Sequence, residues 1–325
     1  MSVDFTIKGA GVAGLCVASE LARRGATVRL LDPMGAPSAH GCSWWAGGML
    51  APDCEGEVAE EPVVRLGRDA ATWWAAQGVD VTYQGSLVLA LGRDRQELDR
   101  FARRTENHQM LGRDGLAELE PHLGDRFQRA LYMEVEAHLN PREALAHLVE
   151  QLETRGISIQ NDGPVEGQLI DCRGLAAKDS LPDLRGVKGE MVVLRAPDIS
   201  LSRPIRLLHP RFPLYIVPRG DGVFMLGATQ IESGERSRAT VRSVMELLNT
   251  AYALHPAFGE AELLEVGVDA RPAFPDNLPR ITRKDETLFV NGLFRHGYLL
   301  APAMARMVAE LVLNGTQPEL WKDAA

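Results

Sequence analysis

Cysteine is scarce in this chain of 325 residues, and its cysteines are not closely paired. The four are Cys16, Cys42, Cys54 and Cys172, and no two of them form a Cys-x-x-Cys motif. Zinc-binding and dithiol redox motifs are therefore not expected, and we expect no metal site. So few cysteines in a chain of this length do not suggest a disulfide framework, and a reducing, cytoplasmic location fits best.

Basic charge and long hydrophobic runs are also lacking. The formal net charge is −9 at pH 7 and is spread along the chain. This argues against nucleic acid as a partner, because backbone phosphates need a basic face. No stretch offers enough uninterrupted apolar residues to cross a bilayer, so we expect no membrane span. The N-terminal apolar stretch carries Asp4 and Lys8 and does not resemble a signal peptide.

The remaining composition, 45% hydrophobic and 24% charged, is that of a globular protein with one large or two ordinary domains. Its N-terminal segment predicts a strand at 5–8, a helix at 12–24 and a second strand at 27–31. Strand, turn, helix, turn and strand follow one another within this short segment. This is the βαβ unit of dinucleotide-binding domains.

The turn between the first strand and the helix has the sequence Gly9-Ala10-Gly11-Val12-Ala13-Gly14. Gly9 permits a tight turn, Gly11 lets the backbone approach a pyrophosphate, and Gly14 lets the helix pack close to the strand. Asp32 ends the second strand, where an acidic side chain accepts hydrogen bonds from ribose hydroxyls. We therefore expect this loop, including Val12 and Ala13, and Asp32 to bind a dinucleotide. The loop alone does not choose between NAD and FAD.

Further along, helical and strand patterns alternate and then give way to a region richer in strands. Helices are predicted near 61–77, 95–109, 112–119, 141–155, 241–252 and 303–313. Strands are predicted near 82–91, 131–133, 157–159, 169–171, 191–194, 214–217, 223–226, 263–268 and 288–290. The pattern indicates an α/β cofactor domain, interrupted by a more antiparallel domain, to which the chain returns at its end.

Three later segments carry a more specific signal. Residues 43–52 are Ser-Trp-Trp-Ala-Gly-Gly-Met-Leu-Ala-Pro, residues 215–229 are Tyr-Ile-Val-Pro-Arg-Gly-Asp-Gly-Val-Phe-Met-Leu-Gly-Ala-Thr, and residues 292–302 are Gly-Leu-Phe-Arg-His-Gly-Tyr-Leu-Leu-Ala-Pro. Together with the glycine loop, they resemble the D-amino-acid oxidase superfamily of flavoproteins and, within it, the glycine oxidases of thiamine biosynthesis. The resemblance extends in the same order over nearly the whole chain.

The resemblance implies an α/β fold, with a Rossmann-like FAD-binding domain of the D-amino-acid oxidase (GR2) type and an inserted antiparallel-sheet substrate domain. We expect the FAD-binding domain at 1–80, 140–188 and 265–325, and the substrate-binding domain at 81–139 and 189–264. Some relatives carry a histidine bonded covalently to the flavin where this chain has Trp45. Tryptophan cannot form that bond, so we expect non-covalent FAD.

The resemblance also implies which residues contact the cofactor. Besides the glycine loop and Asp32, they are Ser43, Trp44, Ala46, Gly47, Gly48, Met49, Gly174, Arg295, His296, Gly297, Tyr298, Leu299 and Leu300. Pro302 is expected in the first turn of the last helix, where a missing N–H costs least. The N-terminus of that helix would then stabilise the negative charge of reduced flavin. Asp171-Cys172-Arg173-Gly174 replaces the turn usual in the family, which leaves the adenine-side contacts open.

For the substrate, the resemblance implies Arg271, Tyr215 and Arg295 as catalytic-site residues. Arg271 would bind a carboxylate in bidentate fashion, and the hydroxyl of Tyr215 would reach the same group. Arg295 would lie beside the substrate. His296 and His40 are alternative general bases, although hydride transfer from a neutral amine to flavin needs alignment rather than a base. Trp44, Trp45 and Met49 are candidates both for the pocket wall and for core packing.

The implied activity is oxidation of glycine or a similar small amine to an imine, with molecular oxygen reoxidising the flavin to give hydrogen peroxide. The imine would hydrolyse to glyoxylate or pass to thiazole synthesis, which makes a thiazole synthase a candidate partner and a homo-oligomer a candidate assembly. One alternative is a dehydrogenase of the same fold that reduces a quinone or carrier. The other is a non-catalytic dinucleotide-binding protein.

Overall fold

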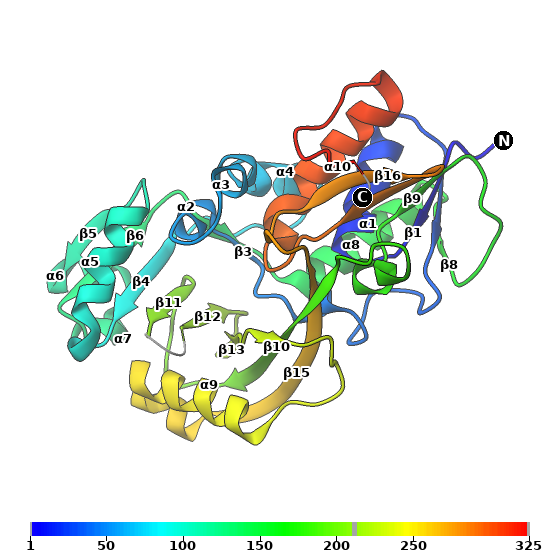
Figure 1. The fold of residues 1–325 in the computed structure, drawn as a ribbon. Helices are drawn as coiled ribbons and strands as arrows, with labels where there is room; N and C mark the ends of the chain where they lie inside the picture. The colour runs from blue at the N-terminus through cyan, green and yellow to red at the C-terminus, as the bar shows by residue number, and fades with distance from the viewer. Residues whose placement is uncertain (1, 210–212, 324–325) are drawn as a thin grey trace.

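The structure is a computed structural model that describes residues 2–209 and 213–323. Its first sheet has the order β16-β17-β9-β1-β2-β8 (Figure 1). The strands are β1 (Phe5–Lys8), β2 (Val28–Leu31), β8 (Ile159–Gln160), β9 (Gln168–Asp171), β16 (Arg280–Lys284) and β17 (Thr287–Asn291). All pairs between these strands are parallel except β16 with β17. This arrangement is the Rossmann-like sheet that the first βαβ unit predicted.

Three helices pack together beside this sheet: α1 (Val12–Arg23), α8 (Pro141–Thr154) and α10 (Gly297–Asn314). The last helix, α10, lies against the first, α1, although they are at opposite ends of the chain (Figure 1). Gly25 follows α1 with φ of +89°, a conformation that ends a helix at little cost for glycine. The predicted end of the first helix is therefore confirmed.

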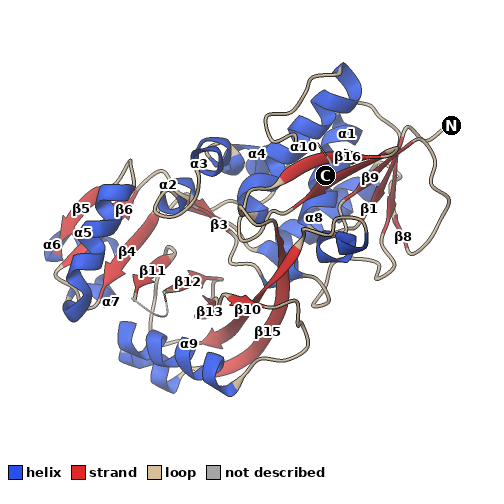
Figure 2. Ribbon diagram, viewed as in Figure 1, coloured by secondary structure: helices blue, strands red, loops and turns tan. Residues whose placement is uncertain are grey.

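The second sheet has the order β14-β10-β13-β12-β11-β4-β6-β5, with β15 also paired to β10 (Figure 2). Its strands are β4 (Ser86–Ala90), β5 (Gln109–Gly112), β6 (Arg129–Met133), β10 (Arg185–Arg195), β11 (Ile205–Leu208), β12 (Leu214–Pro218), β13 (Val223–Gly227), β14 (Ile231–Glu232) and β15 (Glu262–Ala273). Named strands in it pair antiparallel, apart from the parallel pair β11 and β4. The strand-rich region is therefore a mainly antiparallel sheet, as expected.

Helix α9 (Val241–Leu254) covers one face of this sheet. Leu214 and Ile216 of β12 belong to the apolar cluster that includes α9. Because successive side chains of a strand point to opposite faces, Tyr215 lies on the other face. There it packs with Met191, Met225 and Trp45 in a separate cluster. The alternation of β12 thus directs Tyr215 away from α9 and toward the cofactor domain.

The smaller elements connect these layers. They are the helices α2 (Pro52–Glu55), α3 (Glu61–Gly67), α4 (Ala70–Ala76), α5 (Arg95–Arg104), α6 (Arg113–Leu119) and α7 (Pro121–Gly124), the strand pair β3 (Met49–Leu50) and β7 (Ala137–His138), and the 3-10 turns η1 (Cys42–Trp45), η2 (Gly92–Asp94), η3 (Gly174–Asp179) and η4 (Pro256–Glu260). The expected domain boundaries at 188/189 and 264/265 fall inside β10 and β15. A continuous pair of strands, rather than a linker, therefore crosses both boundaries.

Some element predictions were wrong. The helix predicted at 61–77 is two helices, because Gly67 ends α3 where Leu299 packs against it. The helix predicted at 95–109 ends at Arg104, and residues 109–112 instead pair as β5 with β6. Strands β11 and β16 were not predicted. β11 pairs with the distant strand β4, whereas β16 forms a hairpin with the adjacent β17, and the short sequence of each gave too weak a strand pattern.

The last helix also begins earlier than predicted. It starts at Gly297 rather than at 303, so Pro302 lies inside α10 and not in its first turn. Proline cannot donate a backbone hydrogen bond to the residue four positions earlier, which is Tyr298. The carbonyl of Tyr298 accepts instead from the indole Nε1 of Trp74, at 2.9 Å. The helix therefore continues through the proline without leaving this carbonyl unpaired.

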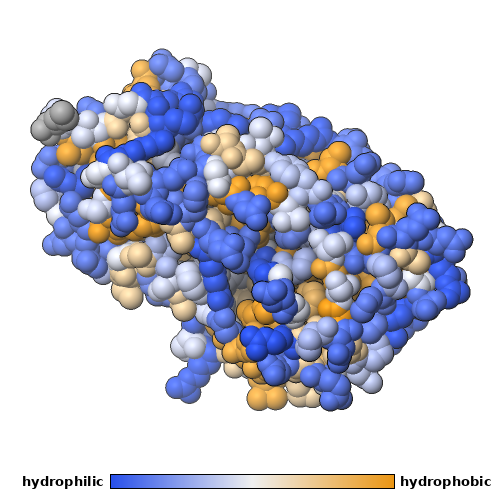
Figure 3. Space-filling view, turned by 180° about the vertical axis from the view of Figure 1, so that it is seen from behind, coloured by the Kyte–Doolittle hydropathy of each residue, from blue (hydrophilic) through white to orange (hydrophobic). Residues whose placement is uncertain are grey.

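The surface is predominantly hydrophilic on the face shown in Figure 3, where hydrophobic residues form several separate patches. Within residues 2–209 and 213–323, no helix is both long enough and apolar enough to cross a membrane.

Candidate active site

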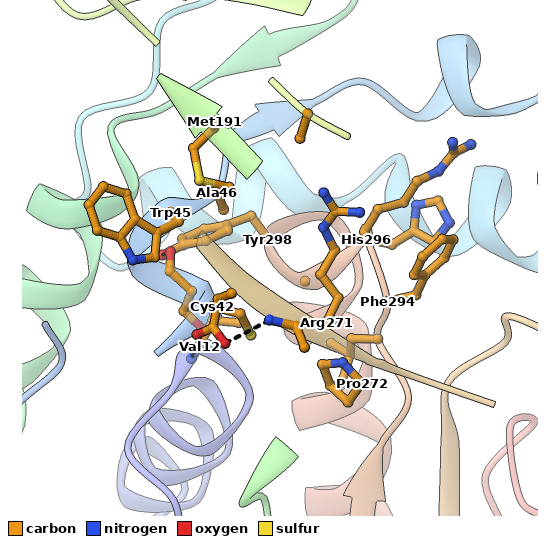
Figure 4. Close-up of a pocket in the computed structure, with 18 of the residues that line it drawn as sticks. Val12, Cys42, Trp45, Ala46, Met191, Arg271, Pro272, Phe294, His296 and Tyr298 are labelled. Carbon is orange, nitrogen blue, oxygen red and sulfur yellow. Dashed lines mark hydrogen bonds between the residues drawn. The ribbon is translucent and has the colours of Figure 1, made fainter. Parts of the chain in front are cut away.

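A cavity of about 1140 Å³ is lined by residues from both sheets and from the segments between them. Its lining includes the loop after β1 and Asp32, together with Tyr215 of β12 and Arg271 of β15. In Figure 4 the Arg271 side chain projects into this space, with Trp45, Ala46 and Met191 to one side and His296 and Phe294 to the other. The cavity thus brings the N-terminal loop and residues from the C-terminal half of the chain into one site.

The glycine loop lines part of the cavity. Gly9 has φ of +100°, and a Cβ there would lie 2.6 Å from the carbonyl oxygen of Cys172. A Cβ at Gly14 would overlap the carbonyl oxygen of Gly9. Only glycine allows the loop to lie this close to β9 and α1 to begin this close to the loop. Gly14 therefore has the packing role expected of it.

Asp32 and Ser43 hold this loop in place. The Asp32 carboxylate accepts hydrogen bonds from the backbone N–H of Ala10 at 2.7 Å and of Met34 at 2.9 Å. The hydroxyl of Ser43 accepts from the backbone N–H of Val12 at 3.0 Å. Each carboxylate oxygen has a second lone pair, so Asp32 can support the loop and still accept from a ribose hydroxyl.

The segment after η1 lies between the loop and β12. A Cβ at Gly47 would lie 2.9 Å from the ring of Tyr215, so glycine is needed for this contact. Arg219, just after β12, donates to the carbonyl of Gly47 at 2.8 Å and to that of Ala46 at 3.3 Å. Burial lowers the pKa of Arg219 to about 10, so the guanidinium remains charged at neutral pH. Arg219 thus fixes the carbonyls of a segment that lines the cavity.

Arg271 is a buried cation with an unused donor. Its Nη2 donates to the carbonyl of Thr229 at 3.1 Å, whereas its buried Nη1 has no hydrogen-bond partner among the described residues. A Cβ at Gly189 would overlap this guanidinium, so Arg271 lies directly on the backbone of the neighbouring strand β10. Burial lowers the pKa of Arg271. A buried, unpaired guanidinium nitrogen favours binding of a carboxylate.

Tyr215 also lines the cavity, close enough to Arg271 for the two to interact electrostatically. Its hydroxyl oxygen would be 2.7 Å from a Cβ at Gly227, so the ring lies between the backbones of Gly47 and Gly227. Burial raises the pKa of the Tyr215 phenol. The hydroxyl is therefore protonated at neutral pH and can donate a hydrogen bond.

Arg295 belongs to an ion-pair cluster that the sequence did not predict. One oxygen of Glu55 lies 2.6 Å from Arg206 Nη2, and the other lies 2.7 Å from Arg295 Nη2. The same carboxylate lies 3.5 Å from Nδ1 of His296. These cations hold the pKa of Glu55 below its usual range despite burial of the carboxylate. Arg295 is thus paired to a carboxylate of the chain itself.

His296 is buried against this cluster, and burial lowers its pKa to about 4. The imidazole is therefore neutral at physiological pH. His40 lies near the cavity rim, where its Nδ1 is 2.7 Å from the hydroxyl of Ser38.

The structure brings most of the predicted site residues to one cavity. Those lining it are Gly9, Gly11, Val12, Ala13, Asp32, Ser43, Trp44, Ala46, Gly47, Gly48, Met49, Gly174, Tyr215, Arg271, Arg295, His296, Gly297, Tyr298 and Leu299. Gly14 and Leu300 do not line it: Gly14 packs against Gly9, and Leu300 is buried in the core of the first sheet.

The sequence did not point to Glu55, Arg206 or Arg219. Glu55 and Arg206 stand in segments with no motif, and only folding brings α2 and β11 together around the carboxylate. Arg219 was within one of the quoted segments, but an arginine before glycine in a turn more often lies on the surface. The sequence could not show that Arg219 is buried against the cavity wall, and so its role was not predicted.

Comparison with known proteins identifies similar chains over this whole length. The family model for FAD dependent oxidoreductases matches residues 4–311. A protein of Rhizobium etli named as a thiamine biosynthesis oxidoreductase, ThiO, is 54% identical, over 96% of this chain and 98% of that protein. The glycine oxidase of Pseudomonas aeruginosa is 28% identical, over 98% of this chain and 96% of that enzyme.

Two further comparisons extend this result. The bifunctional protein ThiO/ThiG of Trichormus variabilis is 28% identical over 97% of this chain, which matches 53% of the bifunctional protein. The crystal structure of glycine oxidase from Geobacillus kaustophilus superposes with a TM-score of 0.83 at 24% identity, covering 98% of this chain and 96% of that one. The superposition confirms the predicted fold class.

Proposed function

Because this chain belongs to the FAD dependent oxidoreductase family, we propose that it oxidises glycine or a similarly small amine. Glycine, oxygen and water would give glyoxylate, ammonia and hydrogen peroxide. The observation that carries the proposal is the buried Nη1 of Arg271, which has no partner among the described residues and lines the same cavity as the glycine loop.

The residues of the cavity fit FAD. The glycine loop lines the cavity beside the N-terminus of α1, where free backbone N–H groups favour a phosphate. Asp32 is available to the ribose. The segment containing Gly47 and Gly48 and the first turn of α10 also line the cavity and would contact the flavin ring. Non-covalent binding follows from Trp45, which cannot be bonded to flavin in the way that histidine can.

Arg271 and Tyr215 would orient the substrate. Arg271 offers a charged donor to the carboxylate, and the protonated Tyr215 hydroxyl offers a neutral donor. Arg295 is held by Glu55, so we assign it the role of setting the electrostatic potential of the pocket rather than of binding the carboxylate directly.

The chemistry in such a site needs alignment. Bound FAD supplies a hydride acceptor for the Cα–H bond of the amine. The chain contributes the carboxylate anchor, which would hold the substrate so that its Cα–H bond is aligned for transfer. His296 is neutral because of its burial, so it adds no positive charge next to the amine. Core residues such as Met191 and Trp45 close the pocket around a small substrate.

The partner and the assembly are part of the proposal. Fusion of a ThiO segment to ThiG in the Trichormus protein supports delivery of the imine to thiazole synthesis in the thiamine pathway. We propose a thiazole synthase as the partner, and a cytoplasmic location and a homo-oligomer as its setting.

A screen for peroxide release tests the proposal. Purified protein with flavin confirmed by absorbance is incubated with glycine, sarcosine, D-alanine and longer amines, and peroxide and oxygen uptake are measured. Peroxide from glycine or another small amine supports the oxidase. Anaerobic bleaching and dye reduction without oxygen uptake would favour the dehydrogenase, and flavin that no amine bleaches would favour the non-catalytic protein.

A further inference from the structure

Two helix N-termini line the cavity that FAD would occupy. Gly11, Val12 and Ala13 belong to the start of α1, and Gly297 and Tyr298 belong to the start of α10. The free N–H groups of a helix N-terminus favour negative charge within about one turn. The position of α10 relative to the flavin therefore affects how well the reduced, negatively charged flavin is stabilised.

The first turn of α10 depends on a side chain from another helix. Pro302 leaves the carbonyl of Tyr298 without its helical donor. Trp74 of α4 supplies the replacement, because its Nε1 donates to this carbonyl at 2.9 Å. The Trp74 side chain is fully buried, and its ring stacks on that of Tyr298 with centroids 5.5 Å apart and an interplanar angle of 30°. Both the backbone and the side chain of Tyr298 are thus held by Trp74.

Tyr298 extends this connection to the glycine loop. Its hydroxyl donates to the carbonyl of Ser43 at 3.0 Å and to that of Pro141 at 3.2 Å. The hydroxyl of Ser43 in turn accepts from the backbone N–H of Val12 in the first turn of α1. A continuous chain of contacts, from Trp74 through Tyr298 and Ser43 to Val12, therefore joins the two helix N-termini.

We propose that Trp74 is a positioning residue, which fixes the first turn of α10 relative to α1 through Tyr298 and thereby sets the reduction potential of the bound flavin. Trp74 does not line the cavity, and Tyr298, which does, is the residue that it both stacks on and donates to. The proposal rests on membership of the FAD-dependent family, and it is independent of which amine is oxidised.

The neighbouring Trp73 provides a matched control. It is also buried, on the same helix, but its Nε1 has no hydrogen-bond partner among the described residues. Trp74→Phe and Trp73→Phe each remove one indole N–H and retain an aromatic ring. In Trp74→Phe a buried carbonyl loses its donor, so we expect the Kd for FAD to rise about tenfold. We also expect the midpoint potential of the bound flavin to become more negative. Trp73→Phe should match the wild type in both measurements.

The potential is measured by reduction of the holoprotein against reference dyes, at FAD concentrations that saturate each variant, so lost occupancy does not affect it. A wild-type potential in Trp74→Phe would overturn the proposal, as would an equal shift in Trp73→Phe. If Trp74→Phe does not fold, Tyr298→Phe decides, since it removes the hydroxyl that contacts the carbonyls of Ser43 and Pro141 and keeps the ring that stacks on Trp74. A shifted potential in that variant supports the proposal, and an unchanged potential overturns it.

Discussion

The carboxylate of Glu55 pairs with the guanidinium of Arg295 at 2.7 Å, and this contact joins α2 to the segment just before α10. The other oxygen of Glu55 pairs with Arg206 of β11. A single buried anion therefore links the second sheet to the C-terminal part of the site. Its loss would leave two buried cations unbalanced next to the substrate cavity.

We therefore expect Glu55→Gln to lower the free energy of unfolding by about 3–5 kcal/mol, the scale for a broken buried ion pair. Glu57→Gln is the control, because Glu57 pairs with Arg100, whose side chain is 48% exposed. That change should cost less than about 1 kcal/mol. Denaturant unfolding of the holoprotein measures the free energy of unfolding of each variant. An equal decrease in the two variants would contradict a stabilising role for the Glu55 cluster.

Arg271→Ala removes the proposed carboxylate anchor. The expected loss of transition-state binding is roughly 2–4 kcal/mol, or about 30- to 900-fold in kcat/KM, while FAD stays bound. Arg242→Ala is a suitable control, since Arg242 lines the cavity but its side chain is 76% exposed. Steady-state kinetics with glycine and the flavin absorbance measure these effects. Unchanged kinetics in Arg271→Ala would contradict the assignment of the anchor.

Gly189→Ala tests the placement of Arg271 without removing its charge. The added methyl group would overlap the guanidinium and displace it. A displacement of about 1 Å in a positioning group costs roughly 100-fold in rate, so kcat/KM should fall by about that factor. Gly112→Ala, where a methyl group meets nothing within 4 Å, should behave like the wild type. A fully active Gly189→Ala enzyme would argue against the need for this geometry.

Glu136 makes stability depend on pH. It is fully buried, it accepts from the backbone N–H of Cys54 at 2.7 Å, and burial raises its pKa to about 7. Its pKa in the unfolded chain is lower, so the folded protein binds the proton more tightly. The stabilisation of the folded state by this tighter proton binding is complete below about pH 4 and is lost as pH rises to 7.

Glu136→Gln, which cannot ionise, should match the wild type near pH 4.5 and be more stable by about 3 kcal/mol at pH 8, because burial raises the pKa of Glu136 to about 7. His296 and the other titrating groups are the same in both proteins. Their contributions therefore cancel when the two unfolding free energies are subtracted at each pH. Glu134→Gln, at an exposed position, is the control. A difference that does not vary with pH would contradict the raised pKa.

Non-covalent binding of FAD is tested by acid precipitation. Because Trp45 cannot be bonded to the flavin, all yellow colour should pass into the supernatant. Flavin absorbance is measured in the supernatant and in the washed pellet. Colour that remains with the pellet after denaturation would contradict the expectation.

The sequence predicted those features that depend on local geometry. The glycine loop, α1, β2 and the strand at 214–217 all follow from short patterns, and the structure has them. The start of α10 was wrong because a sequence rule for proline cannot include a donor from Trp74, far away in the chain. Glu55 and Arg206 were missed for the same reason, since only tertiary structure shows that their charges meet.

The order in which the chain is made has a consequence for the first sheet. Its strands β16 and β17, and the helix α10 that packs on α1, all come from residues after 279. A nascent chain on the ribosome therefore holds β9 without its partner β17, and α1 without α10, until these later residues have been made. Domains fold as units during translation, so the first sheet is completed only after β17 has left the ribosome. C-terminal truncations should accumulate as aggregates rather than as apoprotein.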